Sequence, residues 1–542
     1  MSVGRTVAGV VAVVAIAGGV VVAATAPNQT LALHAAVPSV RPSPSPTALP
    51  PAEQFLAWGP SQAQWDEALA TAAALPLERA AGQVIVASVD SPRASGARKV
   101  VAEHHLGGVI VMGGAVDSTS QVRELTGAVQ DGGGERDWPV IVSVDHEGGP
   151  VARLAPLLPG LPAFMAAGSS KDKSVVRDTY ARTGADMAGL GFNLNYAPVA
   201  DVTIGMGDPV IRTRAAGSDP ENVARTVEAA VEGFVAGGVA PTVKHFPGHG
   251  SVTSDSHVVL PRQRATVQEL EQRDLIPFER AVRAGAPAVM MSHIAVEEWG
   301  GVPATLAPEA YAYLREEWEF TGVIVTDALN MRAVSDDYSS GEAAVAAIGA
   351  GADIVLMPAN VGRAHAGLVS AVEDGTLPRE RLDEAAARSI LLMRWQESLT
   401  PETQADEGNY AQGLVAAGAT VVAPLCGTAL VGDRVVLRGG WAGERDAVAA
   451  RLADHGIEVG SRGTVVELVG APDRAATADV VVALDGPWGL EDSSADAYVG
   501  LYGRSADALA GLADILAGQA SPQAQWPVPV NGLPYGPCPS PR

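Results

Sequence analysis

Eight short apolar runs between residues 83 and 357 constrain the fold of this chain more than any other feature. Most are rich in Val and Ile and lack polar alternation, which is typical of parallel strands buried on both faces. Helical patterns lie between them, for example at 222–236 and 266–284. The repeated unit predicts a (β/α)₈ barrel of the TIM type. The runs cover residues 83–89, 108–112, 140–144, 192–197, 239–243, 288–291, 322–326 and 353–357.

Polar residues follow these runs at one end. Asp145 follows the third run, Asp201 the fourth, Lys244 and His245 the fifth, and Asp327 the seventh. Functional residues of such barrels lie at the carboxyl ends of the strands. The pattern therefore supports the barrel and predicts a site at its carboxyl-terminal mouth.

The length of 542 residues predicts two folded domains and an end segment. We expect the barrel at 67–400, followed by a polar, acidic linker and a smaller α/β (αβα) sandwich domain at 410–542. No Gly-rich phosphate motif follows a strand of the second domain, which argues against a nucleotide site. Its predicted strands cover 434–437, 464–468 and 480–484, and its predicted helices cover 444–455 and 505–517.

Residues 1–26 resemble a targeting segment, because Arg5 precedes an uncharged apolar run. The run has a length between a signal-peptide core and a membrane span, so both a cleaved signal peptide and an N-terminal membrane anchor remain open. A Pro/Ser-rich linker at 27–66 follows. We expect the folded part to lie outside the cytoplasm, either secreted or tethered to the cell envelope.

The net charge of −24 argues against nucleic acid as a partner, because no basic stripe is available for phosphates. The two cysteines are Cys426 and Cys538. In an oxidising compartment they either pair or remain two separate small residues.

A loop at 244–257 gathers three histidines, a lysine and an aspartate within fourteen positions. Asp255 and His257 are two residues apart, so their side chains project to the same side of an extended backbone. The carboxylate can then hold one imidazole tautomer and make His257 a proton donor and acceptor. With Asp327 as nucleophile, this pair suits a retaining displacement at a sugar carbon, although the usual proton carrier is a carboxylic acid.

A zinc site is the alternative. His245, His249, Asp255 and His257 are suitable ligand types. However, the loop contains Gly and Pro rather than a helix, and no H-E-x-x-H motif is present. A zinc-dependent cell-wall amidase or hydrolase remains the second hypothesis.

Over residues 67–400 the chain resembles family 3 glycoside hydrolases of the β-N-acetylglucosaminidase (β-hexosaminidase) branch. The motifs that carry the resemblance are KHFPGHG at 244–250, DSHVVLP at 255–261, SVDHEGGPVARL at 143–154 and GVIVTDALNM at 322–331. It implies a retaining exo-β-N-acetylglucosaminidase that releases terminal β-linked GlcNAc from peptidoglycan-derived glycans, with phosphorolysis as a possible side activity. It implies neither metal nor cofactor, and we expect a monomer.

The resemblance also assigns roles to individual residues. It makes Asp327 the nucleophile, His257 the general acid/base and Asp255 the residue that orients His257. Three positions depart from the family: His146 replaces the usual Gln, Pro150 stands where Arg is common, and 212–217 lacks an aromatic residue. We expect these departures to alter sugar recognition rather than the reaction. The residues implied to hold the sugar are Asp145, Arg153, Arg214, Lys244 and His245.

Overall fold

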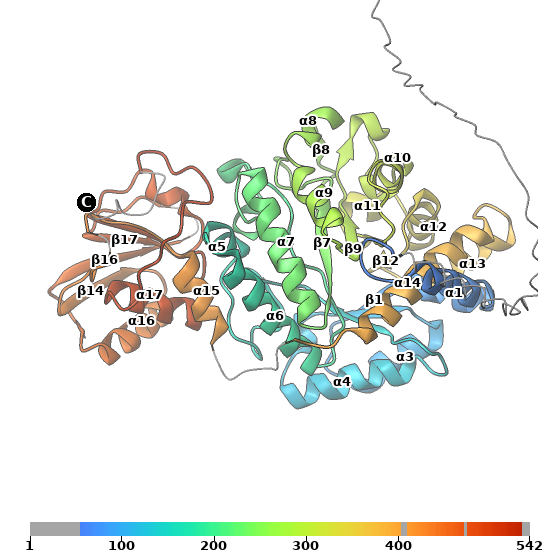
Figure 1. Ribbon diagram of the computed structural model, residues 1–542, viewed down its shortest axis with the longest axis horizontal. Helices are drawn as coiled ribbons and strands as arrows, with labels where there is room; N and C mark the ends of the chain where they lie inside the picture. The colour runs from blue at the N-terminus through green and yellow to red at the C-terminus, as the bar shows by residue number, and fades with distance from the viewer. Residues whose placement is uncertain (1–54, 403–408, 426, 471–473, 534–542) are drawn as a thin grey trace, which may run out of the picture. The chain divides into compact units, whose positions relative to one another are not determined.

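The computed structural model describes residues 55–402, 409–425, 427–470 and 474–533 (Figure 1). The predicted targeting segment, most of the predicted linker, and both Cys426 and Cys538 lie outside these residues. In the described part, no helix combines the length and apolarity needed to cross a membrane.

Eight parallel strands form the first sheet, in the order β11-β9-β7-β6-β3-β2-β1-β12. A parallel bridge between Val325 of β11 and Ile354 beside β12 joins its two ends, so the sheet closes into a barrel. Each strand lies in or overlaps one of the eight predicted runs, and the (β/α)₈ barrel is confirmed. The strands are β1 Ile85–Val89, β2 Gly108–Val111, β3 Ile141–Val144, β6 Leu194–Asn195, β7 Ala240–Phe246, β9 Ala288–Met291, β11 Val323–Thr326 and β12 Val355–Leu356.

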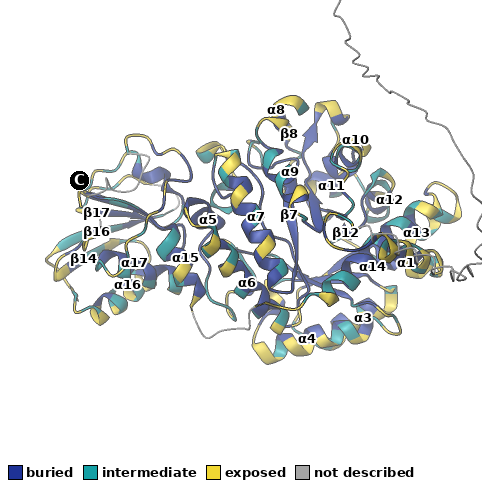
Figure 2. Ribbon diagram, in the orientation of Figure 1, coloured by how far each residue is buried: buried dark blue, intermediate teal, exposed yellow. Residues whose placement is uncertain are grey.

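Helices surround the barrel and bury one face each, whereas the barrel strands are buried except at Ser88 of β1 (Figure 2). In α7 (Pro220–Ala236), Asp219 caps the first turn by accepting a hydrogen bond from the backbone of Asn222. Val223, Val227 and Phe234 then recur at helical spacing on its buried face. The other long helices of this ring are α3 Ala94–His104, α4 Thr119–Gly132, α6 Lys173–Gly189, α12 Ser340–Ala350, α13 Val361–Glu373 and α14 Arg379–Ser398.

Two predicted boundaries differ from the structure. The single helix expected at 266–284 is two helices, α8 Val267–Glu271 and α9 Ile276–Arg283. Pro277 lacks a backbone N–H and cannot continue a helix from the preceding turn, so it starts a new one. The barrel start expected at 67 lies inside α1 (Gln62–Ala73), which begins at a capping box formed by Ser61 and packs against α14.

A second, six-stranded sheet has the order β13-β18-β17-β16-β14-β15, with only β13 antiparallel to its neighbour. Along β17, Val480 and Val482 join one hydrophobic cluster, and Val481 and Ala483 join another that contains Trp526. This alternation shows a sheet buried on both faces and confirms a second α/β domain. Its strands are β13 Thr420–Val422, β14 Arg434–Gly439, β15 Glu458–Val459, β16 Thr464–Val469, β17 Val480–Ala483 and β18 Ala497–Gly500, and its helices are α15 Tyr410–Gly418, α16 Ala442–Asp454 and α17 Ala506–Leu516.

Candidate active site

Strand β7 carries Lys244 into the mouth of the barrel, where the ammonium meets two carboxylates. Lys244 Nζ lies 2.6 Å from Asp145 Oδ1 and 2.7 Å from Glu147 Oε1. Asp145 directly follows β3, and Glu147 lies in β4 (His146–Gly148). Burial alone would lower the pKa of Lys244, but Asp145 and Glu147 outweigh it and raise that pKa. Lys244 is therefore a fixed cation.

Arg214 completes this group from a short helix, η3 (Arg212–Arg214). It donates from Nε to Glu147 Oε2 at 2.9 Å and from Nη2 to Glu147 Oε1 at 2.8 Å, a bidentate pair. Burial would raise the pKa of Glu147, but Arg214 and Lys244 hold it well below its usual range. Sequence reasoning missed Glu147. The sequence feature that could have identified it is its position, two residues after the strand-end Asp145 and inside a motif already recognised.

His245 is oriented by Asp201. Its Nδ1 lies 2.7 Å from Asp201 Oδ2, and Asp201 Oδ1 accepts the backbone N–H of His249 at 2.6 Å. With the proton on Nδ1, Nε2 is an acceptor and lies 3.4 Å from Arg214 Nη2. Asp201 is thus a positioning residue behind His245.

Asp327 follows β11, and its carboxylate is held by its own loop. Oδ1 accepts the backbone N–H of Ala328 at 2.7 Å. His293 Nε2 donates to the carbonyl of Ala328 at 2.9 Å and so supports the same turn. Burial would raise the pKa of Asp327, but His293, His245, the Ala328 N–H and Lys244 together lower it. The carboxylate is therefore ionised at neutral pH.

Asp255 and His257 form a pair in an exposed loop. Asp255 Oδ1 lies 2.8 Å from His257 Nδ1 and also accepts the backbone N–H of His257 at 2.8 Å. The His257 side chain is 60% exposed and that of Asp255 39%. Burial would raise the pKa of Asp255, but these two hydrogen bonds outweigh it and lower that pKa. The second ring nitrogen, Nε2, remains available for proton transfer.

One cavity of about 370 Å³ brings the predicted residues together. Asp255 does not line it but is hydrogen-bonded to His257, which does. Arg153, after β5 (Val151–Ala152), contributes a buried Nε that has no hydrogen-bond partner in the described part of the chain. An unpartnered donor on the wall is suited to a bound hydroxyl or carbonyl. The predicted residues on the wall are Asp145, Arg153, Arg214, Lys244, His245, His257 and Asp327.

Residues 77–392 match the model of the glycosyl hydrolase family 3 N-terminal domain. The chain belongs to glycosyl hydrolase family 3. It is therefore a glycoside hydrolase, and the barrel that holds the cavity is the family's N-terminal domain.

Several relatives of this family 3 glycoside hydrolase carry informative names. β-Hexosaminidase LpqI of Mycobacterium tuberculosis is 35% identical over 312 residues, which cover 54% of this chain and 77% of that protein. β-Hexosaminidase A of Pseudoalteromonas piscicida is 33% identical over 321 residues, which cover 54% of this chain but only 53% of the relative. A family 3 β-N-acetylglucosaminidase from Paenibacillus sp. is similar in structure, with a TM-score of 0.76, 28% identity, and coverage of 85% of this chain and all of that one.

In this family 3 glycoside hydrolase, all four residues considered as zinc ligands are hydrogen-bonded, and two of them, Asp255 and His257, bond each other. His245 contacts Asp201, His257 contacts Asp255, and His249 Nε2 lies 2.8 Å from Ser256 Oγ. In the part of the chain that the structure describes, no three His, Cys, Asp or Glu side chains are grouped to hold a metal ion. The arrangement favours the glycosidase interpretation of the loop.

The departure at His146 does not reach the cavity. The His146 backbone bonds the amide of Asn195 at 3.0 and 2.9 Å, and its Nδ1 accepts the N–H of Leu154 at 3.3 Å. Burial lowers its pKa to about 4, so the ring is neutral. His146 therefore supports the β4–β5 hairpin, and the expectation that it alters sugar recognition directly finds no contact to support it. Pro150 is exposed at the turn of the same hairpin.

Proposed function

We propose that this family 3 glycoside hydrolase is a retaining exo-β-N-acetylglucosaminidase. The observation that supports this most is that Asp327 and the Asp255–His257 pair serve one cavity, which Lys244 and Arg153 also line. The names of the β-hexosaminidase and β-N-acetylglucosaminidase relatives agree with this activity. A cavity of about 370 Å³ lies near the lower end of ligand-pocket sizes and suits one terminal sugar unit.

The reaction would proceed in two displacements. Asp327 attacks the anomeric carbon through Oδ2, because Oδ1 is occupied by the Ala328 N–H. His257 Nε2 gives a proton to the leaving oxygen, so the glycosidic C–O bond breaks and a bond from the sugar to Asp327 forms. The now neutral His257 takes a proton from water, which attacks the same carbon and releases Asp327. Two inversions give net retention.

The remaining wall residues hold the sugar during both steps. Lys244, Arg153 and Arg214 carry N–H donors, and Asp145 accepts. Charge-assisted hydrogen bonds from fixed groups position the ring without a further entropy cost at the moment of reaction.

Turnover of a chromogenic aryl N-acetyl-β-glucosaminide tests this activity, with the matching aryl β-glucoside as control. We expect release of the aryl group from the first compound only, with the β-anomer as the first sugar product by proton NMR. Preference for the glucoside would contradict the sugar assignment. An initial α-anomer would contradict the double displacement.

Phosphorolysis is a second candidate activity, because the proton carrier is an imidazole rather than a carboxylate. An imidazole repels an incoming phosphate less than a carboxylate would, and Lys244 and Arg153 add positive charge to the same wall. Direct assay of the product N-acetylglucosamine 1-phosphate, with and without added phosphate, shows whether water or phosphate accepts the sugar. Absence of this product at saturating phosphate would leave hydrolysis alone.

For the biological setting, we propose peptidoglycan-derived fragments with terminal GlcNAc as substrates and an extracytoplasmic location, secreted or tethered by residues 1–26. The apolar leader and the Pro/Ser-rich linker support the location. We also propose a monomer. Three experiments test these statements. Fractionation of cells that produce the full chain tests the location, and sedimentation of the purified protein tests the monomer. Mass spectrometry of digested muropeptides tests the substrate.

A further inference from the structure

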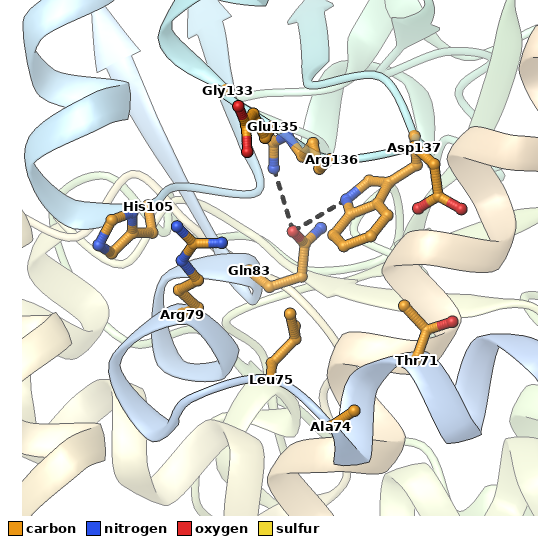
Figure 3. A pocket seen from close by; sticks show the side chains of 11 residues that line it. Thr71, Ala74, Leu75, Arg79, Gln83, His105, Gly133, Glu135, Arg136 and Asp137 are labelled. Atoms are coloured by element: carbon orange, nitrogen blue, oxygen red, sulfur yellow. Dashed lines mark hydrogen bonds between the residues drawn. The ribbon is translucent and has the colours of Figure 1, made fainter.

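A second cavity, of about 620 Å³, opens at the other end of the barrel strands (Figure 3). Among its lining residues, Gln83 precedes β1, His105 precedes β2 and Trp138 precedes β3. The catalytic candidates, in contrast, follow their strands. The two cavities share no lining residue. We call this second one the amino-end cavity.

The amino-end cavity holds Arg136 in a fixed position. Arg136 Nη1 donates to Gln83 Oε1 at 3.1 Å and to the carbonyl of Leu106 at 3.2 Å. Trp138 Nε1 donates to the same Gln83 oxygen at 3.1 Å, as the dashed lines in Figure 3 show. The guanidinium is therefore oriented by neutral acceptors, while its buried Nε has no partner in the described part of the chain.

A second arginine, Arg79, lines the same cavity. Within the described residues, neither Arg79 nor Arg136 has a carboxylate within ion-pair distance. Burial, together with the charge of Arg79, lowers the pKa of Arg136 to about 10. Arg79 is exposed. A buried cation without a counter-ion is costly, and an anion bound beside Arg136 would reduce that cost.

The acidic side chains on the wall do not supply this counter-ion. Asp137 is taken by Arg394, whose Nη2 lies 2.8 Å from Asp137 Oδ2. Glu135 is exposed and is not ion-paired with either arginine. Among the described residues, the two arginines thus have no ion-pair partner, and they lie in the same wall as apolar surface from Leu75 and Trp138.

We propose that the amino-end cavity binds a small organic anion, whose carboxylate or phosphate group contacts Arg79 and Arg136 and whose apolar body packs on Leu75 and Trp138. The volume exceeds what an inorganic ion fills, and the mixed wall favours a ligand with one charged end. Unlike the catalytic cavity, the amino-end cavity is not proposed to bind a sugar.

Isothermal titration of the full chain with phenyl phosphate, benzoate, inorganic phosphate and uncharged benzyl alcohol tests the proposal. We expect saturable binding of at least one aryl anion, weaker binding of inorganic phosphate and none of the alcohol. Whichever of phenyl phosphate and benzoate binds more tightly identifies the preferred charged group as phosphate or carboxylate. Arg79→Gln should weaken binding about tenfold, because one charge-assisted hydrogen bond is lost. Arg98→Gln, an exposed arginine on α3 outside the cavity, should leave binding unchanged.

The catalytic cavity also contains arginine and lysine side chains, so Arg153→Gln is the second control. It should leave aryl-anion binding intact, and Arg79→Gln should leave glycoside turnover intact. Failure of all anions to bind, equal binding of the alcohol, wild-type binding by Arg79→Gln, or loss of binding in Arg153→Gln would each overturn the proposal. None of these outcomes depends on the proposed glycosidase activity.

Discussion

Two parts of the active site differ in how the protein holds them. The strand-end cluster, formed by Asp145, Glu147, Arg214 and Lys244, is mostly buried, and its two acids and two bases balance in charge. The pair of Asp255 and His257 lies in a loop, and the His257 side chain is 60% exposed whereas that of Lys244 is 3% exposed.

This difference agrees with the roles that we propose for the two parts. Groups that hold a sugar gain from being fixed and partly dehydrated, because their hydrogen bonds then cost no reorganisation. A group that carries a proton must reach first the leaving oxygen and then water, so it needs solvent access. The strand ends provide the first condition and the loop provides the second.

Removing Asp327 should have the largest effect of all. Asp327→Ala should reduce turnover of every glycoside by roughly 10⁴-fold or more, because the covalent route is lost. Thermal unfolding should remain close to wild type, since within the described residues the carboxylate accepts one hydrogen bond, from Ala328. The control is Asp337→Ala, an exposed aspartate in the same segment, which should retain full activity.

Removing the proton carrier should give a loss that depends on the substrate. His257→Ala should slow glycosides with poor leaving groups by about 10²–10⁴-fold, but affect activated aryl glycosides much less, because only the former need a proton. Val258→Ala, an exposed neighbour in the loop, is the control. Equal losses on both substrate types would remove His257 from this role.

Breaking the strand-end cluster should affect stability as well as activity. Glu147→Gln removes the carboxylate that pairs with Arg214 and one of the two that pair with Lys244, and we expect a loss of about 3–5 kcal/mol in the free energy of unfolding. Denaturant unfolding of this variant, next to the exposed Glu103→Gln, measures it. A change below about 0.5 kcal/mol, typical of surface sites, would mean that the cluster is not held by charge pairing.

Lowering the pH should have the smallest effect, a gradual loss of stability as carboxylates of the site are protonated. The folded-state pKa values of Glu147, Asp201 and Asp327 are lowered. Their stabilisation is therefore fully present above the unfolded-state pKa, about 4 for a carboxyl, and is lost as pH falls through the lower folded-state values. Unfolding free energy measured from pH 6 to pH 2 should decline, less steeply in Glu147→Gln. An equally steep decline in the wild type and in Glu147→Gln would show that Glu147 contributes nothing to the loss of stability at low pH.

The sequence predicted the barrel well, because strands buried on both faces are continuous apolar runs. It missed β15, whose two residues are both exposed, since such a strand has no apolar pattern. In the site, the strand-end acids and bases were visible from their positions. Glu147 lies two residues after Asp145 in a recognised motif, but sequence reasoning gave it no role; its bonds to Arg214 and Lys244 show that it belongs to the cluster. Nor could the sequence show that His146 does not line the cavity.

The central claim is that Asp327 forms a covalent bond to the sugar while His257 moves the proton. Incubation with an activated 5-fluoro glycoside of N-acetylglucosamine, followed by peptide mass spectrometry, tests it most directly. We predict one sugar per chain on the peptide that contains Asp327, with slow turnover and no label in Asp327→Ala. A label on Asp145 or Glu147, or steady turnover without any label on the protein, would contradict the account.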